Sequence, residues 1–443
     1  MACFAASAQS SSVYNALYAN TGQSSARYAA TGGAMTAMGA DPGAIMTNPA
    51  GMAIYRQSHF NVGLGQSLNH VNDGKQLSHI GYTWARQLGS RYGLAMSYQY
   101  ARDGWDGFWS QYRNNPSESM VDVLLDQSVG AGAPEDLMGE GLVMPYAAYQ
   151  GYILEYDDNM SEYFSLAEGN PSTRTQTYRM GYGGTRSMWG IALRGPKFSI
   201  GWSSMRENRH AYEALVVHES GYSGYTSAFT MRMSDTMSTS GTSQRLGVIA
   251  RLDDGLQVAA YVSQPAYVTT RWEQTIRVTP ETEMDDSAFE LFDDEKWTNT
   301  SPLRFGVAAS QTINNQGFAS AEYHYSQFID PIIIAPLAEV SAGYAISSEL
   351  QGTHEIRVGG ELRNGALAYR AGIRGITSGH IYEDHSALGQ LSCGLGFIQE
   401  SMQFNITASM THRNASIIDP VTASPWVLNN SSLYLQAGVQ FKI

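Results

Sequence analysis

Charged and apolar side chains alternate in the stretch EIRVGGELRNGALAYRAGIR, residues 355–374. Successive side chains of a β-strand point to opposite faces, so the charged residues share one face of such a strand. Arginines beside glutamates allow two kinds of chemistry: ion pairing within the network, or binding of an anionic group by the surplus arginines. The charged positions are Glu355, Arg357, Glu361, Arg363, Arg370 and Arg374.

A tight turn is expected in the middle of this stretch, because Asn364-Gly365 is the strongest short signal for a β-hairpin. A two-residue turn at this pair places Glu355 opposite Arg374 and Arg370 diagonal to Glu361. A charge network that stabilises the fold, or that docks another segment of the chain, is the simpler interpretation. Anion binding by the surplus arginines is the alternative.

Other chemistry finds little support in the sequence. The motifs HExxH and GxSxG and the phosphate-binding P-loop are all absent, and the glycine-rich GYGGTR lacks the spacing of a dinucleotide site. The two cysteines, Cys3 and Cys393, form no disulfide or zinc pattern. His210 and His218 fall in a predicted external loop, where solvated side chains are the simpler reading. We therefore expect no enzyme activity, no cofactor and no metal site.

The net charge of −13 argues against nucleic acid as a partner, since phosphate binding requires clustered lysine and arginine. Much of the acid is local: residues 281–295 hold eight carboxylates. A solvated acidic loop is the commoner explanation of such a run, and a cation-binding loop is the other.

The elements that carry these residues are predicted to be strands. No apolar run approaches the roughly 18 residues that a membrane helix requires, whereas period-two alternation recurs, most clearly in LYLQAGVQFKI at residues 433–443. We predict fourteen strands near 57–69, 76–87, 91–101, 173–193, 197–209, 241–252, 255–277, 302–312, 317–328, 354–364, 366–377, 388–397, 400–412 and 431–443.

The connections between these strands alternate between short turns and long loops. This parity is typical of an outer-membrane barrel with short periplasmic turns and long external loops. A sheet that spans lipid must also close, because an open edge leaves backbone groups unsatisfied. The prediction is an all-β protein, a 14-stranded antiparallel transmembrane barrel in contact with outer-membrane lipid and lipopolysaccharide. The long loops are expected near 102–172, 210–240, 278–301, 329–353, 378–387 and 413–430.

Two short helical turns are predicted directly before the first strand, in GADPGAIMTNPAGMAIY, residues 39–55. Asp and Asn favour the N-cap of a helix and Pro favours the next position, so Asp41-Pro42 and Asn48-Pro49 should each begin one. Residues 1–8 resemble the end of a secretory signal. We assign 9–56 to a compact N-terminal segment and 57–443 to the barrel.

The stretch SSARYAATGGAMTAMGADPGAIMTNPAGMAIY resembles the N-terminal signature of the FadL/TodX family of outer-membrane transporters for long-chain fatty acids and other hydrophobic compounds. In that family this segment is a hatch that plugs a fourteen-stranded barrel, and substrate leaves sideways through the wall. The resemblance implies a hatch here that includes Asp41, Pro42, Asn48, Pro49, Ala50 and Gly51.

Two functions remain open at this stage. The resemblance implies passive transport of small hydrophobic molecules, such as long-chain fatty acids. The alternative is a non-transporting structural or interaction subunit of a larger outer-membrane complex, for which the long loops offer docking surface to protein partners. The first loop contains ESMVDVLLDQSV, in which Val121, Leu124 and Leu125 predict a helix.

Overall fold

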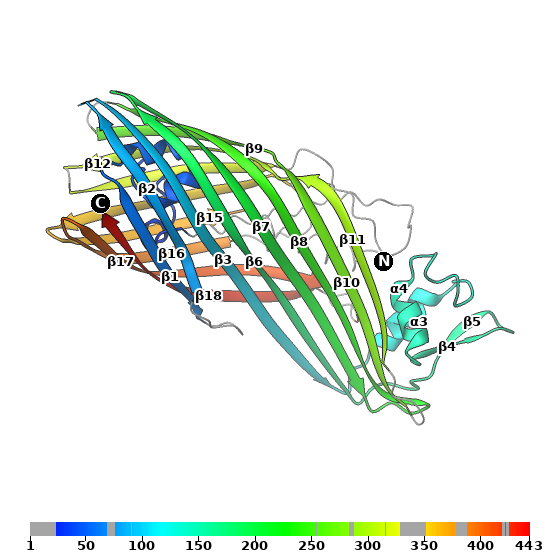
Figure 1. The fold of residues 1–443 in the computed structure, drawn as a ribbon. Coiled ribbons are helices and arrows are strands. Elements are labelled where there is room, and N and C mark those ends of the chain that lie inside the picture. The colour runs from blue at the N-terminus through cyan, green and yellow to red at the C-terminus, as the bar shows by residue number, and fades with distance from the viewer. Residues whose placement is uncertain are drawn as a thin grey trace.

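A single antiparallel sheet closes on itself to form the wall of the molecule (Figure 1). The structure is a computed structural model that describes residues 24–68, 76–89, 91–252, 255–282, 288–314, 316–327, 351–377, 388–418, 421 and 425–443. Sixteen strands take part, and pairing between β8 and β9 completes the ring.

Fourteen of these strands make the barrel, as predicted. The first six are β1 (His59–Leu68), β2 (Gln76–Leu88), β3 (Tyr92–Asn114), β6 (Thr173–Arg194), β7 (Phe198–Ser220) and β8 (Thr226–Arg251). The next four are β9 (Leu256–Gln264), β12 (Leu303–Ile313), β13 (Gly317–Gln327) and β14 (Thr353–Asn364). The last four are β15 (Leu367–Ile376), β16 (Leu388–Ile398), β17 (Met402–Ile418) and β18 (Pro425–Lys442), which pairs with β1.

The other two strands, β10 (Tyr267–Thr282) and β11 (Phe289–Thr300), extend the wall outward beside β8. They follow β9 and precede β12, and the breaks fall at Pro265-Ala266 and Ser301-Pro302. Proline cannot donate to a sheet ladder, which accounts for the interruption at these positions.

Several predicted loops are in fact strands. Residues 210–220 and 226–240 continue β7 and β8, and β10 and β11 occupy much of 278–301. The described parts of 102–114 and 413–430 also extend strands. The extension of β8 was missed because its outer positions are polar, so the alternation of hydrophobicity that marks a lipid-facing strand is weak there; they are Arg232, Ser234, Thr236, Ser238 and Ser240. On the extension of β7 the outer positions mix polar and apolar residues, with His210, Tyr212 and Val216 among them.

An apolar belt surrounds the outside of the barrel. On β7, Phe198 and Ile200 are 62% and 59% exposed, and the outward positions Arg206 and Asn208 farther along are polar and exposed. A closed sheet with such a belt satisfies its backbone internally and presents hydrocarbon to lipid, so the barrel is a membrane barrel. None of the described helices is long and apolar enough to cross a membrane.

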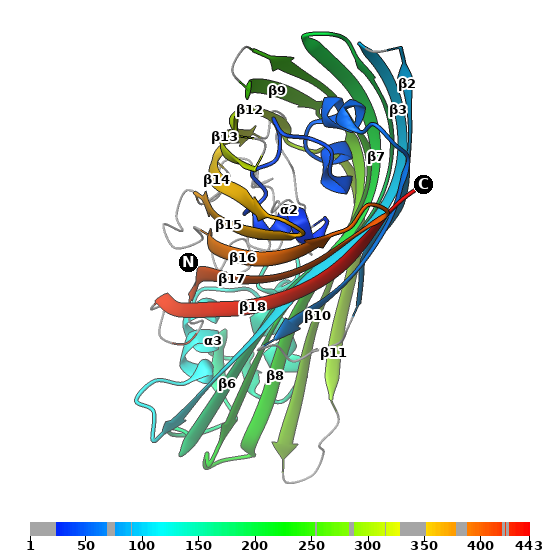
Figure 2. The same cartoon turned by 90° about the vertical axis from the view of Figure 1, so that its left-hand side faces the viewer.

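The described N-terminal segment, residues 24–55, lies inside the barrel (Figure 2), and we call it the lumen segment. It contains the short helix α2 (Ala26–Ala30) and the 3-10 helices η1 (Pro42–Ile45) and η2 (Pro49–Ile54). Helix α2 contacts β15 to β18, whereas η2 contacts β3 and β6 to β8. The predicted signal remnant, residues 1–8, lies outside the described residues.

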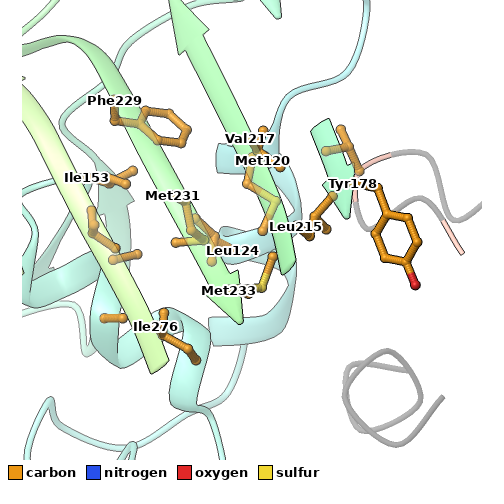
Figure 3. Close-up of a cluster of buried hydrophobic side chains, with 14 of the residues drawn as sticks. Met120, Leu124, Ile153, Tyr178, Leu215, Val217, Phe229, Met231, Met233 and Ile276 are labelled. Atoms are coloured by element: carbon orange, nitrogen blue, oxygen red, sulfur yellow. The ribbon is translucent and has the colours of Figure 1, made fainter. Parts of the chain in front are cut away.

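A small loop domain follows β3 at the far end of the longest strands (Figure 1). It consists of α3 (Met120–Ser128), α4 (Val143–Gln150), β4 (Leu154–Asp157) and β5 (Glu162–Ser165). The helix predicted around Val121 is therefore confirmed as α3. The apolar side chains of the loop domain pack on the inner face of β7, β8 and β10 (Figure 3). We call this packed group the outer apolar cluster; it includes Met120, Leu124, Ile153, Leu215, Val217, Phe229, Met231, Met237, Trp272 and Ile276.

Candidate functional site

Both turns of the lumen segment are capped by the residues that the sequence indicated. Asp41 is the N-cap of η1 and accepts a hydrogen bond from the Gly43 amide at 2.8 Å. Asn48 is the N-cap of η2 and accepts one from the Ala50 amide at 3.1 Å. Pro42 and Pro49 follow the caps, where a missing N–H costs nothing. Each turn therefore has its cap within the segment itself.

Glycines in the barrel wall allow the second turn, η2, to pack closely against the wall. A Cβ on Gly201 of β7 would lie 2.4 Å from the Ala50 nitrogen, and one on Gly247 of β8 would lie 1.9 Å from the Asn48 side-chain oxygen. Asn48 also donates its amide hydrogens to the Val248 and Thr36 carbonyls. On this side the backbone of the segment therefore touches the wall directly.

Glu361 of β14 anchors the opposite side of the segment. Its carboxylate accepts hydrogen bonds from Arg27 of α2 at 2.8 Å and from Arg370 of β15 at 2.6 Å. Arg363 forms a third ion pair with it at 2.7 Å and is the partly exposed member of the group. Arg370 also donates to Asn405. The acid is thus surrounded by three guanidinium groups, one of which belongs to the segment.

The predicted register of this hairpin was wrong by two residues. Asn364 pairs with Leu367, so Gly365 and Ala366 form the turn and Glu361 stands directly opposite Arg370. Gly365 has a φ of +61°, which a glycine adopts without strain. The Asn-Gly pair marks a turn correctly, but the asparagine stays in the strand.

Arg357 forms a second link between wall and segment. Its guanidinium donates to the Tyr28 hydroxyl and to the Gly33 carbonyl, and it pairs with Glu355 at 2.6 Å. Arg374 pairs with the same carboxylate. The six charged residues predicted to share one face of this hairpin do so, on the lumen side of β14 and β15, and we call them the charged ladder. All except Arg363 are buried.

A third link uses a carboxylate that sequence reasoning did not single out. Glu322 of β13 accepts hydrogen bonds from both the backbone amide and the hydroxyl of Thr36, at 2.5 and 2.8 Å. It also contacts His324, whose other ring nitrogen meets the Tyr261 hydroxyl at 2.7 Å. This chain of polar contacts leads from the segment across β13 to β9.

An arginine-rich pocket lies against the lumen segment. Thr47 and Met46 of the segment line it together with five arginines and one glutamate from five strands. Arg245 donates to the Thr47 carbonyl at 3.2 Å and lies 4.8 Å from the ring centre of Tyr261. Glu207 pairs with two of the arginines. The arginines of this arginine pocket are Arg186, Arg209, Arg245, Arg304 and Arg357.

Sequence reasoning found only one of these five arginines. A signal was available: Arg245 precedes Leu246, and Arg304 lies between Leu303 and Phe305. An arginine in the polar phase of a lipid-facing strand points into the lumen. The spatial convergence of five such positions from separate strands, however, depends on the barrel's register and is not encoded locally.

Two other predicted features lie elsewhere. His210 and His218 are on the extended strand β7 rather than in a loop, and His218 contacts Thr230. Part of the acidic run, residues 283–287, lies outside the described residues, and β11 holds its later part. Within the described chain, no group of three or more His, Cys, Asp or Glu side chains is arranged to hold a metal ion.

The chain resembles known structures in fold but little in sequence. It matches no protein-family model, and no curated protein matches its sequence. The monoaromatic hydrocarbon channel CymD aligns with 95% of the chain and 97% of its own length, at 14% identity and a TM-score of 0.57. The toluene transporter TbuX of Ralstonia pickettii covers 96% and 99%, at 15% identity and a TM-score of 0.54.

The chain has the hydrocarbon-channel fold. A FadL homologue of Pseudomonas aeruginosa also aligns, over 95% of the chain and 98% of its own length, at 9% identity and a TM-score of 0.50. The likeness expected from the N-terminal motif is thus confirmed as a likeness of fold. The closed barrel and the apolar belt around it agree with a location in a bacterial outer membrane.

Proposed function

We propose that the protein lets small hydrophobic molecules, long-chain fatty acids or similar compounds, cross the outer membrane passively, and that the lumen segment is the hatch that gates this route. The observation that carries the proposal is the lumen segment itself: residues 24–55 are almost wholly buried inside a barrel of the hydrocarbon-channel fold. The segment is held by hydrogen bonds with side chains and by close packing on wall glycines, and not by the ladder hydrogen bonds of the sheet, so it can move without unfolding the wall.

The hatch roles follow from the contacts. Asp41 and Asn48, with Pro42, Pro49, Ala50 and Gly51, form two rigid turns that would move as units. The charged ladder on β14 and β15 would hold them closed through its contacts with α2. A molecule that leaves sideways would enter lipid directly, because the outside of the wall is apolar.

Uptake by whole cells tests this function. Cells with an intact lipopolysaccharide layer and no similar transporter should take up labelled dodecanoate or 1-dodecanol several-fold faster when they express the protein. Arg370→Glu, which weakens the anchoring of the segment, should change this rate. Equal uptake with and without the protein, together with a stoichiometric protein partner after mild extraction, would contradict transport and favour the subunit of an outer-membrane complex.

A further inference from the structure

We propose that Arg102 of β3 and Arg206 of β7 bind the two phosphates of lipid A, the glycolipid that anchors lipopolysaccharide in the outer leaflet. Lipid A carries a phosphate at each end of a disaccharide, and its acyl chains lie in the membrane. The two arginines stand on the outside of the wall, so the inference concerns the lipid-facing surface and is independent of the proposed transport function.

Arg206 lies at the outer boundary of the apolar belt. From the short turn outward, the lipid-facing positions of β7 are Phe198, Ile200, Trp202, Ser204 and Arg206. The distance from Phe198 to Arg206 is about 26 Å along the strand, which is about 20 Å of height at a tilt of about 40°. The apolar band of such barrels is about 25 Å tall, so the long arginine side chain reaches the head groups.

Aromatic side chains lie directly below both arginines. Trp189 of β6 pairs with the residue two positions before Arg206, and Trp202 meets Trp189 edge to face with ring centres 4.6 Å apart. Tyr98 of β3, which precedes Arg102 on the same face, pairs with Trp189 on the other side. Tryptophan and tyrosine mark the level of the head groups in membrane proteins. The acyl chains of a lipid held by the arginines would therefore lie against the apolar belt.

The charges of the two arginines are available to a ligand. Both residues are exposed, and neither forms a salt bridge within the described part of the chain. The residues that flank Arg206 on the neighbouring strands are the neutral Ser187 and Thr242. Farther out on the same face the situation differs, because Arg271 pairs with Asp294 at 2.7 Å. A phosphate at Arg206 thus meets no acidic neighbour on these strands and accepts two parallel hydrogen bonds from the guanidinium group.

The spacing of the two arginines suits a ligand with a phosphate at each end. Thr185 of β6 pairs with Arg102 on one side and with Asn208 of β7 on the other, and Arg206 lies two residues below Asn208. The Cα atoms of the two arginines are therefore about 12 Å apart. Polar neutral side chains lie between them and can bind sugar hydroxyls. Asn208 accepts a hydrogen bond from Ser240 at 2.8 Å, which leaves its own N–H groups as donors.

Competitive binding to the purified full-length protein in mild detergent tests the proposal. Native mass spectrometry of an equimolar mixture of bisphosphoryl and monophosphoryl lipid A, with identical acyl chains, isolates the effect of the second phosphate. An arginine near an anionic lipid surface contributes roughly fivefold to affinity, so the wild type should retain the bisphosphoryl form about fivefold over the other. Arg206→Gln and Arg102→Gln should each remove this preference, and Arg206→Lys should restore part of it.

Arg86→Gln is the matched control. Arg86 of β2 is also exposed on the outside of the wall, but it lies beside the short turn, at the opposite boundary of the apolar belt. This variant should keep the full preference. Lipid A should also raise the midpoint of thermal unfolding more in the wild type and in Arg86→Gln than in Arg206→Gln, because a ligand that binds only the folded state stabilises it.

Three outcomes would overturn the site. The first is equal retention of the two lipid A forms by the wild type. The second is loss of the preference in Arg86→Gln as well as in Arg206→Gln, which would mean that any exposed arginine beside the belt suffices. The third is retention of phosphatidylglycerol as strongly as bisphosphoryl lipid A, which would mean that the arginines bind anionic lipid without regard to the disaccharide.

Discussion

The lumen segment is held chiefly by carboxylates on the β13 to β15 side of the barrel. On the β6 to β8 side it packs closely on wall glycines and accepts hydrogen bonds from the side chains of Ser203 and Arg245. On the first side, Glu361 and Glu322 receive hydrogen bonds from Arg27 and Thr36. On the second, η2 rests against Gly201 and other glycines. Charge changes should therefore disturb the first contact and volume changes the second.

The two sides also differ in height. Strands β13 to β15 have 10 to 12 residues, whereas β6 to β8 have 22 to 26. The tall side carries the loop domain and the outer apolar cluster far from the segment's charged anchors. The carboxylates that anchor the segment and the outward extension of the wall thus lie on different strands, and the variants below test whether the two act independently.

Arg370→Glu should have the largest effect. The side chain is fully buried and pairs with Glu361, so reversing its charge places two carboxylates side by side. Leaving a buried charge without its partner costs about 3–5 kcal/mol. We expect faster proteolysis of residues 24–55 and a changed conductance in planar bilayers.

Arg363→Glu makes the same charge change beside the same acid, on a side chain that is 42% exposed. It should cost less than about 1 kcal/mol, because solvent screens exposed pairs. Equal proteolysis of residues 24–55 and equal conductance in Arg370→Glu and Arg363→Glu would contradict the role of the buried Arg370–Glu361 pair in anchoring the segment.

Gly201→Ala should disturb the opposite side by volume alone. The new Cβ would lie 2.4 Å from backbone atoms of Pro49 and Ala50, which must shift. Overpacking of this kind costs about 1–3 kcal/mol. Hydrogen exchange should show reduced protection in η2 with the anchor at α2 retained. Gly375→Ala is the control, since a Cβ there meets nothing within 4 Å. Equal loss of protection in the two variants would contradict the close packing of η2 on Gly201.

Asp235→Asn tests a charge on the tall side, beyond the apolar belt. Burial raises the pKa of the Asp235 carboxyl to about 6, partly offset by a hydrogen bond from Gln274 at 2.8 Å. The folded state then holds a proton that the unfolded state releases near its ordinary pKa of about 4. Stability contributed here is therefore present below about pH 4, falls as pH rises to about 6, and is flat above.

Between about pH 4 and pH 6 the free energy of unfolding should fall by about 1–3 kcal/mol, and the loss of stability should be detected in β8 and β10. Thermal unfolding and hydrogen exchange at pH 4.5 and 6.5 should show this slope in the wild type and little of it in Asp235→Asn. Proteolysis of residues 24–55 should be the same in both proteins, since Asp235 does not touch the segment. An identical pH slope in both would contradict the assignment.

The strand count, the closure and the two capped turns followed from the sequence, because each depends on local chemistry. Alternation marks a lipid-facing strand, and Asp41-Pro42 and Asn48-Pro49 mark helix starts wherever they occur. The extensions of β7, β8 and β17 did not follow, because a strand with water on its outer face lacks that alternation. Their ladder partners, which stabilise them, lie far away in the chain.

In the candidate site, too, the local features could be predicted from the sequence and the contacts between distant segments could not. The charged face of β14 and β15 could be identified from period two, but the register could not, since either Asn364-Gly365 or Gly365-Ala366 fits a tight turn. Glu322, Thr36 and Arg245 were missed because their role depends on contacts between residues 286 and 198 positions apart in the chain. Strand phase predicts where such a side chain points, and only the closed barrel determines what it meets.

Ser119→Ala should have the smallest effect and tests whether the loop domain is independent of the hatch. Ser119 caps α3 in a reciprocal pair with Asp122, a contact worth about 0.5–2 kcal/mol. The loss should fall near the lower end, because the Glu219 carboxylate still accepts a hydrogen bond from the Met120 amide at 3.0 Å. Hydrogen exchange should report weaker protection in α3 alone. Combined with Arg370→Glu, the two losses should add, since distant sites without shared partners are independent. A change in proteolysis of residues 24–55 caused by Ser119→Ala alone would mean that the loop domain is coupled to the lumen segment, and the independence of the two would fail.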